Sequence, residues 1–394
     1  MSHKPRSCLY WVLALCLAAC DSTADTKDGS FRANAADGVQ AAGAKLLAAV
    51  ARDQRLEVWT ADPSVRVQPT TAVGSGRRVI VEGPRAAYES YQVVVHARSE
   101  RHEDVNFMAS DLSDGRGHTL RASNITFFRE WFVDFDGVNA ENGNKPVPRD
   151  SPTRDTRVAD PLIPFIDPYT GKALGAPFGV DAGMNRPVWV DVFIAADTAP
   201  GEYAGTITVT GRDQKSIAVP IAVTVWDLVL PDQRAVQTFF QMDVDPLINF
   251  HRETWACDGG SCYLEWHPQA RVVIKRYEEL AHSHRIDVGQ TFVRGPGRAD
   301  DCAEPTDWAE YDEAIQPYMD GSYFADRVPS TRLQIPLTPG ADYGAQTCAE
   351  AQYKAIAKAW AHHLKSKRWF DRAIIFAEDE PPPEVWPALA KHAR

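Results

Sequence analysis

The fold is decided by residues 186–233, which include RPVWVDVFIAADTAPGEYAGTITVT (186–210) and VPIAVTVWDLVLPDQ (219–233). Apolar and polar residues alternate through 187–194, 205–210 and 217–225, and turn residues separate these runs. A period of two is typical of strands that bury one face. Residues 91–97 form a similar run, so we predict an antiparallel β-sandwich over residues 45–231. The Asn-, Pro- and Asp-rich residues 136–185 indicate a long insertion rather than core.

The pattern changes after residue 231. Strand-like stretches at 236–244, 286–293, 333–337 and 373–377 alternate with helical patterns at 268–284, 306–319 and 349–366, and a short helix closes the chain. Such alternation predicts a parallel sheet with right-handed crossovers. A complete (β/α)8 barrel typically needs about 250 residues. We therefore predict that residues 232–394 form an incomplete TIM-type barrel of about four β/α units.

An incomplete barrel leaves two strand edges unpaired, which needs an explanation. We favour a fragment or a prematurely ended reading frame. The missing half could instead lie on another chain, or the region could be a small open α/β domain.

The predicted helices carry apolar stripes that we interpret as core packing. Thr306 is the expected N-cap of the second helix and Gly321 its expected end. We expect His282, near the end of the first helix, to complement the helix dipole. The stripes are Val273, Tyr277 and Leu280, then Trp308, Tyr311, Ile315 and Tyr318, then Tyr353, Ile356, Trp360 and Leu364.

The N-terminus has the pattern of a targeting segment. Lys4 and Arg6 precede an apolar stretch at 8–19, which ends in LAAC at 17–20. This ending resembles a bacterial lipobox, which implies removal of residues 1–19 and a lipid on Cys20; a plain signal peptide cut near the same place is the alternative. Residues 20–44 would then be the lipidated Cys and a flexible linker. We expect a lipid-anchored protein of the bacterial cell envelope, facing the periplasm or the cell surface, with the membrane as a partner.

Composition excludes several classes of protein. The formal net charge is −11, with 24% charged and 44% hydrophobic residues. A general nucleic-acid binder needs clustered Lys and Arg, so we expect no nucleic-acid partner. No run of 18 apolar residues is present, so no transmembrane helix is expected.

Four cysteines remain after Cys8, Cys16 and Cys20 are set aside, namely Cys257, Cys262, Cys302 and Cys348. An even number in a compartment that permits disulfides indicates two bridges. The spacing indicates one bridge between Cys257 and Cys262 and a second between Cys302 and Cys348, one of three possible connectivities. A zinc site is the weaker alternative because no CxxC pair is present, and we predict no metal.

The candidate catalytic residues follow the predicted strands, because barrel enzymes place their chemistry at the C-terminal strand ends. Asp379 and Glu380 follow the fourth strand and precede three prolines. Two close carboxylates in a partly desolvated site raise one pKa and create a general acid, as glycosidic cleavage requires. The alternative is that both acids only favour the N-terminus of the next helix.

Four segments resemble glycoside hydrolase family 123 proteins, whose catalytic domain was long classed as a domain of unknown function. Two are the sandwich stretch 186–210 and the junction 219–233. The others are HRID (284–287), before the second strand, and FAEDEP (376–381), which resembles the family's Asp-Glu catalytic pair. The resemblance spans roughly residues 56–390 and implies a sandwich followed by the first half of a catalytic barrel.

This resemblance implies a retaining, substrate-assisted hydrolase of β-linked N-acetylgalactosamine-type glycosides. Glu380 would be the acid/base, and Asp379 would bind the 2-acetamido N–H and stabilise the oxazolinium. Asp243 and Gln290 are weaker candidates for contacts to sugar hydroxyls, with strand-end capping as the alternative. No cofactor or metal is implied, and barrel strands five to eight are expected downstream or on another chain. Two alternatives stay open: a non-catalytic carbohydrate- or surface-binding lipoprotein, and a structural envelope lipoprotein.

Overall fold

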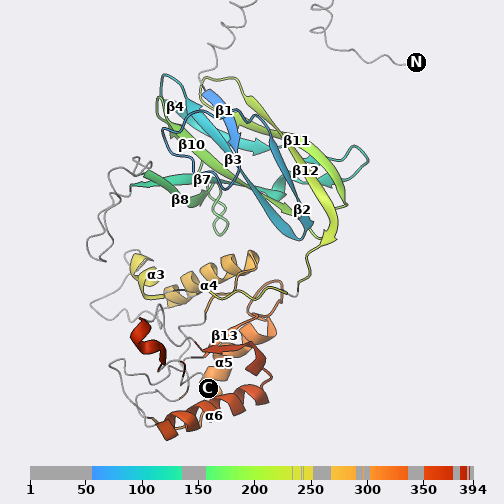
Figure 1. The fold of residues 1–394 in the computed structure, drawn as a ribbon. Coiled ribbons are helices and arrows are strands. Elements are labelled where there is room, and N and C mark those ends of the chain that lie inside the picture. Colours follow the sequence, from blue (N-terminus) through green and yellow to red (C-terminus); the bar gives the residue numbers. More distant parts are fainter. Residues whose placement is uncertain are drawn as a thin grey trace, which may run out of the picture. The chain divides into compact units, whose positions relative to one another are not determined.

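A computed structural model describes residues 56–134, 157–232, 234–240, 242, 244–251, 268–289, 296, 302–335, 350–375, 382–387 and 390. The chain divides into two compact units, Met1–Asp227 and Leu228–Arg394 (Figure 1). Each unit is described by itself.

Unit 1 contains a five-stranded antiparallel sheet. Its order is β1 (Leu56–Ala61), β3 (Ala87–Ala97), β10 (Asn185–Ile194), β7 (Ile125–Asp134) and β8 (Arg157–Pro164). The runs predicted at 91–97 and 187–194 are confirmed as parts of β3 and β10. In β10 the β-branched residues at every second position are buried, whereas Val93, Val94 and Val95 of β3 are all buried because both faces of that strand are covered.

The second sheet has the order β2 (Val79–Arg85), β12 (Ile217–Val229), β11 (Gly201–Thr210), β4 (His102–Ala109) and β9 (Phe178–Val180). The short strand β5 (Leu112–Ser113) pairs with β11, β6 (Thr119–Leu120) pairs with β5, and the 3₁₀ turn η1 spans Ala122–Asn124. β11 and β12 confirm the strands predicted at 205–210 and 217–225.

One hydrophobic core contains residues from both sheets, as in a sandwich. Val93 and Val188 come from the first sheet, and Ile207 and Val223 from the second; all four are 0% exposed. On each strand the side chains that enter this core lie at every second position, so the alternation in the sequence produces the buried surface.

The prediction that residues 136–185 lie outside the core is wrong for part of that range. β8 and β9 fall within it, and Phe178 and Val180 are buried in the sandwich core. Pro161 and Pro164 are tolerated in β8 because it is an edge strand, where a missing N–H need not break the ladder. The prolines therefore led to the prediction of a loop where the chain forms an edge strand.

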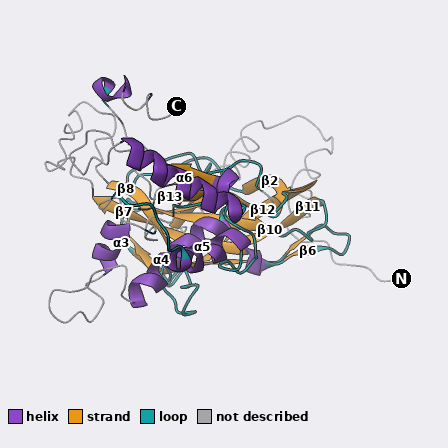
Figure 2. Cartoon of the chain, turned by 90° about the horizontal axis from the view of Figure 1, so that it is seen from below, coloured by secondary structure: helices purple, strands orange, loops and turns teal. Residues whose placement is uncertain are grey.

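Unit 2 alternates strands and helices. The helices are α3 (Val244–His251), α4 (Pro268–Ser283), α5 (Ala309–Asp320) and α6 (Glu350–Ser366), and the strands are β13 (Leu333–Ile335) and β14 (Ala373–Ile375). The 3₁₀ turn η6 (Phe370–Arg372) directly precedes β14, and the 3₁₀ turn η7 (Pro383–Val385) follows it in the sequence. Figure 2 shows these helices in purple and the strands in orange.

Strand pairing in unit 2 is parallel wherever it is described. β13 pairs with β14, and an isolated parallel bridge joins Phe240 to Val288. In Figure 1, β13 lies between α4 and α6. Parallel strands with intervening helices are the expected β/α units, and the incomplete barrel itself stays a prediction.

The apolar stripes of two helices are confirmed. Tyr311 and Ile315 of α5 and Trp360 and Leu364 of α6 are buried in one cluster with β13. α5 ends at Gly321, whose φ of 81° is the left-handed conformation that glycine adopts without strain. The predicted N-cap Thr306 is wrong: Trp308 occupies that position, and Oδ1 of Asp307 accepts a hydrogen bond from the backbone N–H of Ala309 at 3.0 Å.

The predicted face of α4 is wrong. Tyr277 and Leu280 are 43% and 59% exposed. The buried positions recur every four residues: Ala270, Ile274, Glu278 and His282. Two of these are polar, so a search for apolar periodicity selected the neighbouring face.

Candidate functional site

The candidate residues predicted in unit 2 lie outside the described residues. Asp379 and Glu380 follow β14 in the sequence by four and five positions, counted from Ile375. Asp243 and Gln290 follow the bridged residues Phe240 and Val288. The structure therefore places the strands that precede these acids and amides and leaves their roles as predictions.

The opposite ends of the same strands are joined by a buried ionic network. Asp287 is 3% exposed, and its Oδ1 atom accepts a hydrogen bond from Nη1 of Arg234 at 2.9 Å. Its Oδ2 atom accepts from the backbone N–H and the hydroxyl of Thr331. The three residues precede or begin successive strands, so the carboxylate links strand starts and has no free oxygen for chemistry.

His282 extends this network. Its ring stacks on Phe324 with centroids 3.6 Å apart, and Nη2 of Arg234 donates to Nδ1 at 3.0 Å. Nδ1 must therefore be the acceptor, which leaves the proton on Nε2, 3.0 Å from the Asp326 carboxylate. Burial and the Arg234 charge lower the pKa of His282. The explanation by the helix dipole alone is therefore incomplete.

A second buried carboxyl joins α4 to the end of α5. The hydroxyls of Tyr318 and Tyr323 donate to Oε2 of Glu278 at 3.1 and 2.6 Å. Burial raises the pKa of Glu278 to about 7, although both hydrogen bonds oppose the shift. These two hydrogen bonds tie α4 to the end of α5.

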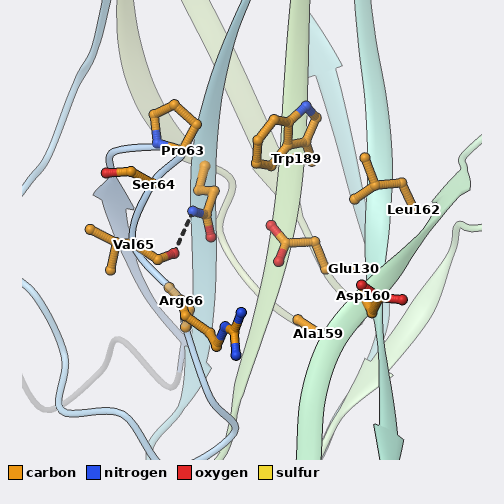
Figure 3. A pocket seen from close by; sticks show the side chains of 11 residues that line it. Pro63, Ser64, Val65, Arg66, Glu130, Ala159, Asp160, Leu162 and Trp189 are labelled. Carbon is orange, nitrogen blue, oxygen red and sulfur yellow. Dashed lines mark hydrogen bonds between the residues drawn. The ribbon is translucent and has the colours of Figure 1, made fainter. Parts of the chain in front are cut away.

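A pocket of about 260 Å³ lies on the outer face of the five-stranded sheet in unit 1. Gln92 of β3 lies directly opposite Trp189 of β10, and Glu130 of β7 lies opposite Leu162 of β8. The pocket floor thus crosses four adjacent strands. Ala159, Asp160 and Leu162 of β8 form one side wall of the pocket, and the segment Pro63–Arg66 forms the opposite wall. Figure 3 shows Glu130 between these two walls.

Hydrogen bonds fix two of the floor residues. Nε2 of Gln92 donates to the carbonyls of Asp62 and Val65 at 2.9 and 2.8 Å, which determines the orientation of the amide. Nε1 of Trp189 donates to Oδ1 of Asp191 at 2.6 Å. The amide oxygen and the indole ring are therefore held in place by the protein.

Two acceptor atoms in this floor lack partners. Oε1 of Gln92 and Oε1 of Glu130 are buried and have no hydrogen-bond partner among the described residues. Gln92 is 1% and Glu130 6% exposed, and burial raises the pKa of Glu130 to about 7. The sequence signal was weak: a glutamine and a glutamate stand among other polar residues in the largely apolar strands YQVVVHA and ITFFREWFVD.

The predictions for lipidation and disulfide pairing concern residues that lie mostly outside the described part of the chain. Cys302 is described, whereas Cys20, Cys257, Cys262 and Cys348 lie outside the described residues, so lipidation and disulfide pairing stay predictions. Within the described ranges, His, Cys, Asp and Glu side chains form no group of three that could bind a metal ion. In that same part of the chain, no helix has the length and apolar character needed to cross a membrane.

By its fold, the protein belongs to the class in which an N-terminal antiparallel β-sandwich is followed by a unit of parallel strands and helices. The family comparison then identifies the sandwich, because residues 86–211 match the glycoside hydrolase 123 N-terminal domain. This part of the chain is therefore similar to the N-terminal domain of glycoside hydrolase family 123.

One solved structure supports the fold. A family 123 glycoside hydrolase from Clostridium perfringens is 14% identical, with a TM-score of 0.56 over 85% of this chain and 60% of that one. The chain thus spans less than two thirds of that protein. CfaE, the adhesive subunit of an enterotoxigenic Escherichia coli fimbria, is 14% identical over 44% and 49% of the two chains, with a TM-score of 0.21. No curated protein matches the chain.

Proposed function

We propose that this protein is a retaining glycoside hydrolase of the family 123 type. Its substrates would be β-linked N-acetylhexosamine glycosides, of the N-acetylgalactosamine type. The observation that carries the proposal is the match of residues 86–211 to the family's N-terminal domain. This similarity makes glycosidic cleavage the first activity to test.

The extent of the structural likeness supports the proposal. The Clostridium perfringens enzyme covers 85% of this chain, and unit 1 ends at Asp227 of 394 residues. The likeness therefore includes much of unit 2. There, β14 precedes the dipeptide Asp379-Glu380, at the kind of strand end where barrel enzymes carry catalytic groups.

The proposed mechanism uses the substrate's own acetamido group. Its carbonyl oxygen attacks the anomeric carbon while Glu380 donates a proton to the departing glycosidic oxygen. Asp379 accepts a hydrogen bond from the acetamido N–H and stabilises the positive charge of the oxazolinium. Glu380 then takes a proton from water, which opens the oxazolinium with overall retention. Such enzymes need no nucleophile of their own.

The test compares two aryl glycosides that differ in one group. The protein expressed from its full gene is given an aryl 2-acetamido-2-deoxy-β-galactoside and the matching aryl β-galactoside, which lacks the acetamido group. We expect turnover of the first only, with a β-configured product by NMR. Equal turnover of both would overturn substrate assistance, and turnover of no aryl glycoside would overturn the hydrolase assignment.

We also propose that Cys20 carries the lipid that anchors the protein to the cell envelope. Cys20→Ala is then expected to abolish incorporation of labelled palmitate and to move the protein out of the membrane fraction. Two or three acyl chains are needed for stable anchoring, so loss of the acceptor should be decisive. Cys16→Ala is the control and should leave labelling unchanged. The proposal would be contradicted if the wild-type protein incorporated no labelled palmitate and still remained in the membrane fraction.

A further inference from the structure

The pocket in unit 1 combines three features of a ligand site. Its floor contains a fixed indole ring, that of Trp189. Two buried acceptors, on Gln92 and Glu130, have no partner among the described residues. Buried polar atoms are normally satisfied, so such a pair is able to accept hydrogen bonds from a bound ligand or an ordered water.

The unpaired atoms are not products of loose packing. Both hydrogens of the Gln92 amide are engaged by backbone carbonyls, so turning the amide would break two hydrogen bonds. Glu130 lies next to a register shift between β7 and β8, which occurs between Glu130 and Phe132. Irregularities of this kind are frequent beside functional sites, where they redirect a side chain.

The chemistry of the pocket favours a neutral, hydroxyl-rich ring. Two acceptors require O–H or N–H donors, and an aromatic ring provides an apolar surface for the C–H face of a sugar. The lining has charged groups of both signs, Arg66 beside the carboxyls of Glu130 and Asp160, so no single sign of ligand charge is selected. The volume of about 260 Å³ is below the roughly 300–1,000 Å³ of pockets for drug-sized ligands, so it suits one ring.

We propose that this pocket binds a terminal pyranose ring of a glycan. The ring would lie against Trp189, and its hydroxyl or acetamido N–H groups would donate to Gln92 and Glu130. The choice of a sugar among hydroxyl-rich ligands rests on the proposed function. The site itself rests on the pocket and its two unpaired acceptors. A sandwich with such a site would attach the enzyme to glycans independently of turnover.

The test uses the full chain and isothermal titration with the methyl β-glycosides of N-acetylgalactosamine, N-acetylglucosamine and galactose. We expect at least one to bind, and Trp189→Ala to weaken that binding about tenfold or more. Trp226→Ala is the matched control: this tryptophan is 43% exposed, lies outside the pocket, and should leave binding unchanged. Should Trp189→Ala fail to fold, Ala159→Phe fills the pocket from the edge strand and should also abolish binding.

Glu130→Leu separates a binding role from a structural one. Its raised pKa means that the folded protein binds this proton more tightly than the unfolded chain does. The carboxyl therefore destabilises the fold increasingly as pH rises from about 4.5 to about 7. At pH 8 we expect Glu130→Leu to raise Tm and to weaken glycoside binding. A structural role predicts a lower Tm with binding unchanged.

Three results would overturn the proposal: no glycoside binds, Trp189→Ala leaves binding unchanged, or ethanolamine binds in place of the sugars. Turnover of the aryl N-acetylhexosaminide is measured on the same preparations. Turnover without pocket binding overturns the pocket proposal alone. Pocket binding without turnover by any preparation overturns the proposed function alone.

Discussion

Glu380→Gln is expected to lower kcat/KM for an aryl 2-acetamido-2-deoxy-β-galactoside by about 10²–10⁴-fold, the range for loss of a general acid/base. Glutamine keeps the size of the side chain and cannot donate the proton that the departing oxygen needs. The measurement uses the protein expressed from its full gene, with turnover followed by release of the aryl group. An aryl group that leaves without protonation, such as dinitrophenol, should reduce the loss.

The matched control is Glu384→Gln in the 3₁₀ turn η7. Glu384 is an exposed acid four positions further along the chain. Both variants remove one negative charge from the same segment, so they differ only in the proposed proton transfer. Equal effects of the two substitutions, or full activity of Glu380→Gln, would exclude Glu380 as the acid/base.

The second large effect concerns stability. Asp287→Ala is expected to lower the free energy of unfolding of unit 2 by about 3–5 kcal/mol, the usual cost of breaking a buried pair. The substitution leaves the guanidinium of Arg234 buried beside His282 without its carboxylate. It also removes the acceptor of the Thr331 backbone N–H, which connects a third strand start.

Urea unfolding followed by circular dichroism at 222 nm measures this effect, because α4, α5 and α6 contribute the helical signal. Glu313→Ala provides the control, since Glu313 is exposed on α5. We expect that control to change the midpoint little, as surface substitutions usually shift stability by about 0.5 kcal/mol or less. A similar midpoint for both variants would show that Asp287 is not a buried ionic partner.

Local periodicity was a sufficient guide where one face of an element meets an apolar core. The strands at 187–194 and 217–225 and the stripe of α5 were predicted for this reason. It failed on α4, where Glu278 and His282 are buried by partners 40 and 44 residues away in sequence. No pattern within a helix can show that a distant tyrosine or aspartate will satisfy a polar side chain.

Of the two candidate sites, one could be predicted from the sequence and the other could not. Asp379 and Glu380 could be proposed from the sequence because strand ends and a family resemblance mark them without tertiary contacts. The pocket could not, since Gln92, Glu130 and Trp189 lie on three strands and meet only through the register of β3, β10 and β7.

The sequence by itself determined which segments become strands or helices and where α5 ends, because side-chain periodicity and backbone preference act over a few residues. Only the tertiary structure decided which polar groups are buried, which of them find partners, and which remain open in a pocket. Those outcomes depend on strand register and on atoms from remote segments, which bring together residues that share no local pattern.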